Sequence, residues 1–147
     1  MEIRKARPAD AEDIAAHNIA LARETENTSI TRDTALQGVQ AILDDPGKGF
    51  YLVAVHEQHV VGQLMVTYEW SDWRARPIWW LQSVYVTPSW RQRGIFSQLL
   101  DTLRETADTH DVCALRLYVH HDNQTACQAY RSLGFTPLPY RMYGIPL

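Results

Sequence analysis

The sequence predicts a mixed α/β fold in which one central sheet is flanked by helices. Residues 50–55 and 60–68 are apolar runs typical of strands, whereas the segments before them repeat apolar residues at helical spacing. The short turn at residues 56–59 predicts a hairpin of antiparallel strands. A strand, a helix and another strand are predicted within residues 78–119, an order that indicates a parallel pair joined by a right-handed crossover. We therefore expect a mixed, mostly antiparallel sheet.

The N-terminal third is expected to hold one strand and two helices. Residues 2–7 are predicted as a short strand, and a helix should begin near Asp10. Thr31 is a candidate N-cap for a second helix, because a threonine hydroxyl can accept a hydrogen bond from an unpaired N–H of the first turn. The sequence Asp-Pro-Gly at residues 45–47 should end that helix.

Three further elements are predicted after the hairpin. The apolar run from Ile78 to Val86 should be a strand, residues from about 92 to 109 a helix, and residues 114–119 a strand with alternating faces. Residues 69–77, between the hairpin and the first of these strands, are predicted as a loop.

The C-terminal part is predicted as a helix followed by an extended segment. Asp122 or Asn123 should open the helix, and Gly134 is placed to end it. From Phe135 the chain is extended, but two prolines lie in residues 135–139. Proline cannot donate to a strand ladder, so we expect an edge strand or a broken strand here.

Length and composition are those of an ordinary globular protein. The 147 residues are 46% hydrophobic and 21% charged, which is sufficient for one domain spanning residues 1–147. The formal net charge of −3 does not indicate a general nucleic-acid-binding surface. No apolar run is long enough to span a bilayer and the N-terminus has no signal-peptide pattern, so we expect a cytoplasmic protein with no membrane or nucleic-acid partner.

The cysteines and histidines predict neither a metal site nor a disulfide. Cys113 and Cys127 lack C-x-x-C spacing and are expected to be free thiols. His120 and His121 are adjacent, and adjacent side chains on an extended segment point to opposite faces, so we expect loop histidines that do not share a ligand.

A basic turn between the strand ending at Val86 and the next helix carries the main functional signal. It contains Arg91, Arg93 and Gly94 directly before the apolar positions of the helix. Unpaired N–H groups and the helix dipole both favour negative charge at a helix N-terminus, so phosphate is the expected ligand. A basic loop alone, however, is more often solvated than functional.

Together these motifs resemble the GNAT superfamily of acyl-CoA-dependent N-acetyltransferases. The likeness covers nearly the whole chain and rests on residues 3–10, on residues 86–95 and on residues 123–135, which include Asn123 and Tyr130. The second and third motifs, in this order and separated by one strand, are specific in combination. The resemblance implies a GNAT-like fold, in which the parallel strand pair splays apart.

The resemblance implies that the basic turn holds the pyrophosphate of acetyl-CoA through backbone N–H groups. Arg91 and Gly94 match the family pattern, but Phe96 stands where a small residue is usual. The N–H of residue 96 is retained, so we expect the phenyl ring to turn into the core; the alternative is that it blocks the phosphates. The predicted cofactor-binding residues are Val84, Tyr85, Val86, Arg91, Gln92, Arg93, Gly94, Ile95, Phe96, Ser97, Asn123 and Tyr130.

The same resemblance assigns roles close to the thioester. Pantetheine would pair with exposed backbone groups of Val84 and Val86, and the Val84 N–H would stabilise the oxyanion of the tetrahedral intermediate. Asn123 matches a position that contacts the CoA arm, and a helix cap explains it equally well. Tyr130 matches the general acid that protonates the departing thiolate, whereas the plain alternative is a core tyrosine.

The sequence predicts the residues that would bind the acceptor amine less specifically. Residues 69–77 are aromatic and charged at once, which suits the lip of a binding site. The predicted lip residues are Glu69, Trp70, Asp72 and Trp73. Glu69 and Asp72 are also candidate general bases, although solvated charge or pairing with neighbouring arginines is the preferred interpretation. Trp70, Trp73, Trp79 and Trp80 could form an aromatic wall for an amine, or equally belong to the core or a homodimer interface.

The expected function is transfer of an acetyl group from acetyl-CoA to a primary amine of a small molecule or a peptide, by direct attack and without a metal. A non-catalytic acyl-CoA-binding module or regulatory subunit is the alternative. Nucleotide binding through the same turn is weaker, because the Walker A lysine pattern and the dinucleotide glycine pattern are both absent.

Overall fold

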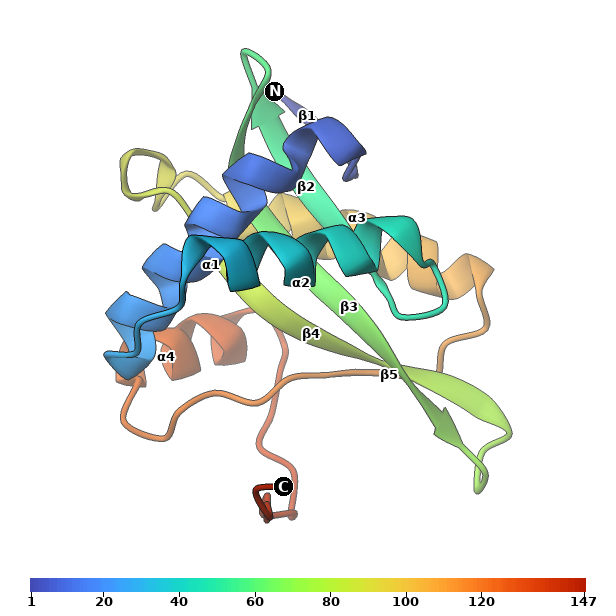
Figure 1. Ribbon diagram of the computed structural model, residues 1–147. Coiled ribbons are helices and arrows are strands. Elements are labelled where there is room, and N and C mark those ends of the chain that lie inside the picture. The colour runs from blue at the N-terminus through green and yellow to red at the C-terminus, as the bar shows by residue number, and fades with distance from the viewer.

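A computed structural model describes residues 1–147 and contains one five-stranded sheet in the order β1-β2-β3-β4-β5 (Figure 1). The strands are Glu2–Lys5 (β1), Phe50–His56 (β2), His59–Ser71 (β3), Arg76–Val86 (β4) and Ala114–Arg116 (β5). The helices are Ala11–Glu26 (α1), Arg32–Asp44 (α2), Ile95–Thr109 (α3) and Gln124–Ser132 (α4). Strands β1 to β4 pair antiparallel and β5 pairs parallel with β4, which confirms the predicted mixed α/β fold.

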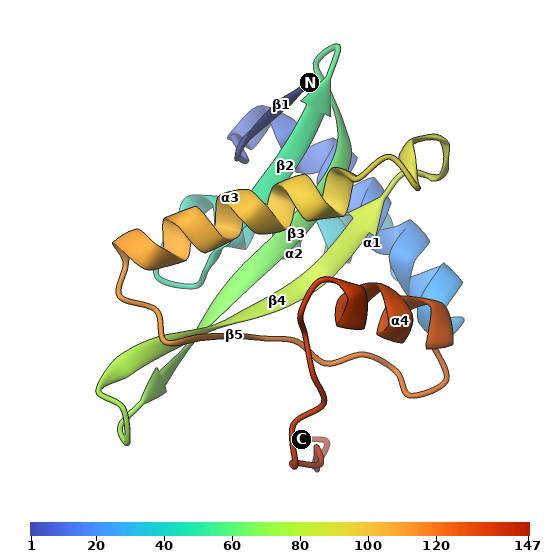
Figure 2. The same cartoon turned by 180° about the vertical axis from the view of Figure 1, so that it is seen from behind.

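Helices cover both faces of the sheet. Helices α1 and α2 lie on one face and α3 crosses the other, as the two opposite views show (Figures 1 and 2). In β2, Leu52 and Ala54 pack in the cluster that includes α3, whereas Tyr51 and Val53 pack with α1 and α2. Because β2 is buried on both faces, its sequence is continuously apolar instead of alternating.

The two N-terminal helices begin in different ways. The Thr31 hydroxyl accepts a hydrogen bond from the Thr34 N–H at 3.3 Å, which confirms the predicted N-cap of α2. Asp10 precedes α1 but makes no cap bond; its carboxylate instead binds Arg4 at 2.7 Å and accepts from the Arg7 N–H. Burial opposes ionisation of Asp10, but these hydrogen bonds outweigh it and lower the pKa of the carboxyl.

The loop predicted at residues 69–77 is much shorter than expected. Strand β3 continues to Ser71 and β4 begins at Arg76, with Glu69 paired to Ile78 and Trp70 paired to Pro77. The polar residues suggested a break, but they lie at the end of a long hairpin where side chains meet solvent. Only the residues between Ser71 and Arg76 form the turn.

Three other boundaries also differ from the sequence prediction. Helix α3 begins at Ile95 and not at residue 92, because Gln92 and Gly94 have left-handed φ angles of 61° and 76°. The strand predicted at residues 114–119 ends at Arg116, where β5 leaves β4. No strand forms after Phe135, so the predicted edge strand is absent.

The separation of β4 from β5 is the feature that shapes the site. The two strands pair only between residues 78–80 and 114–116, and β4 continues to Val86 without a strand on that side. The expected splay of the parallel pair is therefore present. It leaves an opening between the second half of β4 and the segment that leads from β5 to α4 (Figure 2).

Gly62 on β3 lets the start of α3 approach the sheet closely. Gly62 is buried and pairs with Val86, the last residue of β4. A Cβ at this position would lie 2.6 Å from Cγ2 of Ile95, the first residue of α3. The absence of a side chain therefore sets how near the α3 N-terminus and the preceding turn lie to the end of β4.

Gly62→Ala should lower the free energy of unfolding by about 1–3 kcal/mol, because the branched Ile95 side chain cannot move aside without repacking. Gly38→Ala is the matched control, since a Cβ at Gly38 of α2 meets nothing within 4 Å. Alanine favours helix, so this variant should gain about 0.5–1 kcal/mol. Chemical denaturation of both variants tests this, and equal stability of Gly62→Ala and the parent would contradict the close-approach argument.

Candidate active site

A cavity of about 660 Å³ lies where β4 and β5 separate, on the face of the sheet covered by α1 and α2. Its walls come from both of these helices, from the middle of β4, from residues 117–120 and from α4. The cavity brings together Val84 and Tyr130, which the sequence assigned to catalysis, and Asn123, which it assigned to cofactor binding. Most of the lining is hydrophobic.

Tyr130 forms one wall of this cavity from α4. Its ring is edge-on to Phe96 at 5.7 Å and to Phe135 at 5.8 Å between centroids, which fixes its position against α3. Burial, with a smaller contribution from Cys127, raises the pKa of its phenol. The phenol therefore stays protonated at neutral pH and can donate a proton or a hydrogen bond into the cavity.

Phe96 turns toward the protein interior, as expected. Its side chain is half-buried and packs against the core cluster of α3 and the sheet, in contact with Tyr130. The Phe96 ring therefore packs against the Tyr130 ring and does not fill the turn before α3.

Asn123 is both a helix cap and a cavity residue. Its Oδ1 accepts a hydrogen bond from the Ala126 N–H at 3.2 Å, so it is the N-cap of α4.

The residues before Asn123 form a turn and not an extended segment. This corrects the expectation for His120 and His121, whose rings do not point apart but stack with centroids 4.7 Å apart and lie close to Asp122. All three side chains are exposed.

A bulge in β4 lies at the centre of the cavity wall. Gln63 of β3 pairs with Tyr85 and Met65 pairs with Gln82, so two residues of β4, Ser83 and Val84, stand opposite one residue of β3. Ser83 has a left-handed φ of 49°. A bulge locally interrupts the strand ladder, so its backbone groups need other partners.

Gln63 supplies the partner for the bulge. It is completely buried, and its Nε2 donates to the Ser83 carbonyl at 3.2 Å and to Asn18 Oδ1 at 2.8 Å. All peptide bonds are trans, so the C=O of Ser83 and the N–H of Val84, which share one peptide, point in opposite directions. The hydrogen bond from Gln63 therefore orients the Val84 N–H away from the Gln63 side-chain amide.

His17 and Tyr51 complete this polar network. His17 Nδ1 lies 3.0 Å from Gln63 Oε1, and burial lowers the pKa of its imidazole, so the neutral ring donates this hydrogen bond. Asn18 Nδ2 donates to the Tyr51 hydroxyl at 3.2 Å. The sequence prediction missed Gln63; its signal was an amide within the apolar run that begins at Val60.

The turn between β4 and α3 exposes a row of backbone donors. None of the six consecutive N–H groups of residues 92–97 donates a hydrogen bond within the chain. Gly94 is the N-cap of α3 and has no side chain to satisfy them. Unpaired N–H groups at a helix N-terminus, together with the helix dipole, favour negative charge, so this turn is a candidate site for an anion.

Two arginines flank this row. Arg91 donates from Nε to the Val86 carbonyl at 2.8 Å and forms an ion pair with Glu24 at 2.9 Å. Arg93 stacks over the ring of Trp90 at 5.0 Å and is exposed. The turn is therefore positively charged locally in a chain whose net charge is −3.

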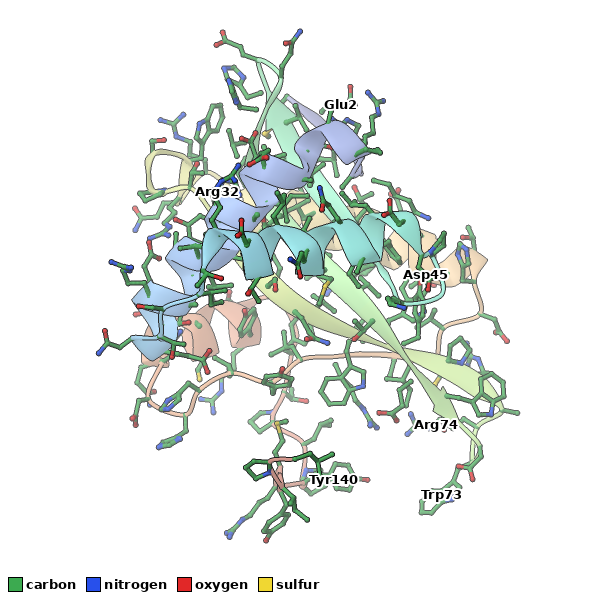
Figure 3. All side chains as sticks on the ribbon, viewed as in Figure 1. Glu2, Arg32, Asp45, Trp73, Arg74 and Tyr140 are labelled. Atoms are coloured by element: carbon green, nitrogen blue, oxygen red, sulfur yellow. The ribbon has the colours of Figure 1, made fainter.

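The residues predicted to form a substrate lip lie elsewhere. Glu69 accepts a hydrogen bond from Trp80 Nε1 at 3.0 Å and pairs with Arg116, and Trp73 is 95% exposed at the tip of the β3–β4 hairpin (Figure 3). The four predicted lip residues lie at the end of the long β3–β4 hairpin, and none of them lines the cavity: Glu69, Trp70, Asp72 and Trp73. Neither Glu69 nor Asp72, the two candidate bases, is among the residues that line the cavity.

The tryptophans of β4 are not part of the cavity wall either. Trp79 is buried in the core cluster with α3, and Trp80 points to the other face. The ionisable side chains that do line the cavity are Glu26, Tyr51, Tyr118, His120 and Tyr130.

The chain matches the model of the acetyltransferase (GNAT) family over residues 13–135 and belongs to that family. It is 41% identical to a possible acetyltransferase from Clostridium difficile 630, whose crystal structure superposes with a TM-score of 0.92 over 99% of this chain and 97% of that one. A Bos taurus thialysine N-epsilon-acetyltransferase is 35% identical over 75 residues, which are 51% of this chain and 44% of that enzyme. The chain thus spans less than half the length of this relative.

A more distant structure shares the fold. The aminoglycoside antibiotic 6'-N-acetyltransferase of Acinetobacter haemolyticus superposes with a TM-score of 0.80 over 100% of this chain and 99% of that one, at 20% identity. Separately, no helix of this chain combines the length and the apolar character needed to cross a membrane.

Gln63→Leu should lower the free energy of unfolding by roughly 3 kcal/mol, because it leaves His17, Asn18 and the Ser83 carbonyl without their partner in the interior. Gln82→Leu is the control, since Gln82 makes a single side-chain hydrogen bond, to Thr67. It should cost roughly 1 kcal/mol or less. Urea denaturation measures both; similar costs for the two variants would show that the network around Gln63 is not structurally important.

Proposed function

We propose that this chain transfers an acetyl group from acetyl-CoA to a primary amine. The observation that carries the proposal is the row of six unpaired N–H groups at residues 92–97, placed at one end of the opening between β4 and β5. Tyr130 lies on the cavity beside that opening. An anion site after the end of β4 and a half-buried phenol beside the same strand gap suit a cofactor that carries both phosphates and a thioester.

The chain has groups that fit each part of acetyl-CoA. The N–H groups of residues 92–97 would bind the pyrophosphate, with Arg93 as the nearby unpaired cation. The amide-rich pantetheine arm would pair with the open edge of β4, at Val84, Tyr85 and Val86, as an added strand does. Asn123, at the entrance to α4, would contact the same arm.

The reaction we propose is direct attack of a neutral amine on the thioester carbonyl. The new C–N bond forms a tetrahedral intermediate, whose oxyanion is stabilised by the Val84 N–H. The C–S bond then breaks, and Tyr130 donates its proton to the sulfur of the leaving CoA. The amine proton leaves through the cavity mouth, where Glu26 and His120 are exposed to solvent.

The cavity supports an amine carried by a largely aliphatic group. Its lining is mostly hydrophobic, and Glu26 is the only carboxylate among the lining residues. A single carboxylate at the mouth attracts a cationic amine, while the apolar walls favour release of its proton deeper inside. The N-epsilon-acetyltransferase relative named above acts, by its name, on a side-chain amine, which is consistent with this acceptor class.

Acetyl-CoA at one hundred times its dissociation constant should raise the free energy of unfolding by about 2.7 kcal/mol, and Arg93→Ala should reduce this gain. Arg74→Ala is the control, because Arg74 lies at the β3–β4 turn, away from the cavity (Figure 3). Thermal shift with acetyl-CoA, and separately with ATP, measures the effect. Absence of stabilisation by acetyl-CoA, or equal stabilisation by ATP, would refute the proposed cofactor.

Tyr130→Phe should lower kcat about a hundredfold or more while leaving acetyl-CoA affinity nearly unchanged, because only proton donation is lost. Tyr118→Phe is the control, since Tyr118 lines the same cavity but is 56% exposed. CoA release with a panel of alkyl and peptide amines measures turnover. Acetyl-CoA binding without turnover on any amine would instead favour the non-catalytic module.

A further inference from the structure

Gly38 lies in the middle of α2, where a glycine is unfavourable. The helix spans Arg32–Asp44, and glycine destabilises a helix interior relative to alanine because it loses more backbone freedom on folding. A left-handed φ or a close contact within the chain would require glycine, and Gly38 has neither. Its φ lies outside the left-handed region, and a Cβ built on it would meet no atom within 4 Å. Nothing in the chain itself therefore explains the missing side chain.

The space over Gly38 belongs to the cavity that also contains Val84 and Tyr130. Gly38 lines this cavity together with Ala35 and Ile42, which lie at helical spacing on the same side of α2. The backbone at Gly38 is exposed, so a molecule in the cavity can lie directly against the helix. A side chain at this position would point into space that such a molecule needs.

The size of the cavity indicates a ligand larger than a simple alkylamine. Its volume of about 660 Å³ lies in the range of about 300–1,000 Å³ that encloses drug-sized molecules. The thioester end of acetyl-CoA would take only the part beside Val84 and Tyr130. The rest of the cavity reaches α1 and α2, where Leu21, Ile30 and Val39 are among its hydrophobic lining residues. Only a ligand with a bulky apolar group would cover this wall.

The charges of the lining restrict the acceptor further. Glu26 is the only carboxylate in the lining, and no lysine or arginine lines the cavity. An acceptor with several amines would therefore bring positive charges that find no carboxylate, and an acceptor with its own carboxylate would find no lysine or arginine to pair with. A hydrocarbon group that carries a single amine fits this lining.

We propose that Gly38 determines the size of the acceptor, which is a monoamine whose branched or cyclic hydrocarbon group lies against the backbone of α2. The hydrocarbon group would cover Gly38, Ala35 and Ile42, with the amine directed toward Val84. This inference rests on the acetyl transfer proposed above and names the class of amine that the same cavity accepts.

Cyclohexylmethylamine and ethylamine are suitable probes, because they are a bulky and a small monoamine with the same reacting group. The parent chain should use cyclohexylmethylamine with a kcat/KM about tenfold higher or more. Gly38→Leu should raise KM for cyclohexylmethylamine about tenfold or more with little change in kcat, because the new side chain fills the space that the ring needs. KM for ethylamine and Kd for acetyl-CoA should change less than about threefold.

Two further variants show whether the effect depends on the space over Gly38. Gly38→Ala should raise KM for cyclohexylmethylamine by only about two- to fivefold, because alanine adds one carbon. Both substitutions at Gly38 should raise the melting temperature by about 1–4 °C, since alanine and leucine favour helix, so unfolding cannot cause the loss. Gln40→Leu adds the same side chain at an exposed position of α2 outside the cavity lining and should leave all of these constants unchanged.

Calorimetry in the presence of CoA measures amine binding without turnover, and so separates this inference from the proposed reaction. Binding of cyclohexylmethylamine that Gly38→Leu weakens, without any acetylated product, would support the acceptor site and refute the acetyl transfer. Turnover of ethylamine with no preference for cyclohexylmethylamine, or equal effects of Gly38→Leu and Gln40→Leu, would overturn the inference about Gly38 and leave the acetyl transfer standing.

Discussion

The early divergence of β5 from β4 is the constraint on which the rest of this structure depends. A parallel pair that spans only residues 78–80 and 114–116 leaves the second half of β4 with one neighbour. Backbone groups released from a ladder are costly in a protein interior unless another partner takes them. Here the gap holds the cavity. Its lining residues come from α1, α2, β4, α4 and the segment between β5 and α4.

The polar network behind β4 makes this opening compatible with a stable core. Gln63, Asn18 and His17 connect α1 to the bulged peptide of Ser83, and no buried side-chain nitrogen or oxygen lacks a partner. The network thus gives a partner to the Ser83 carbonyl, which the bulge releases from the β3–β4 ladder. It also restricts the Ser83–Val84 peptide to one orientation, which is a form of preorganisation that a single ladder bond would not give.

Local chemistry decides which features the sequence could predict. The order of strands and helices as far as α4, the Thr31 cap and the position of the basic turn before α3 were predicted correctly, because they follow from periodicity and from side chains that act on their own backbone. Features that depend on distant residues were not. The hairpin reaches Ser71 because β4 pairs with it, and the Gln63 network needs α1 to pack across the sheet.

The predicted strand after Phe135 failed for a related reason. A strand forms only where its backbone pairs with a neighbour, and residues 136–147 make no backbone hydrogen bond, with Pro137 and Pro139 lacking the N–H donors that a ladder needs. The residues predicted as a lip lie at the end of the β3–β4 hairpin, because the length and direction of a twisted hairpin cannot be read from its composition, and their role as a lip stays a prediction. For the segment after Phe135 and for the hairpin end alike, the residue types suited the predicted role, but the fold determines which other residues they contact.

Gly62 shows that the position of the turn before α3 depends on a residue of the neighbouring strand β3. The turn could exchange most of its side chains and still stand at the same distance from β4, because a glycine that contacts no ligand fixes how close Ile95 comes. Conversely, redesigning the turn for a different anionic group cannot shift it toward or away from the strand. A change in the distance between this turn and β4 would have to start from the buried contact between Gly62 and Ile95.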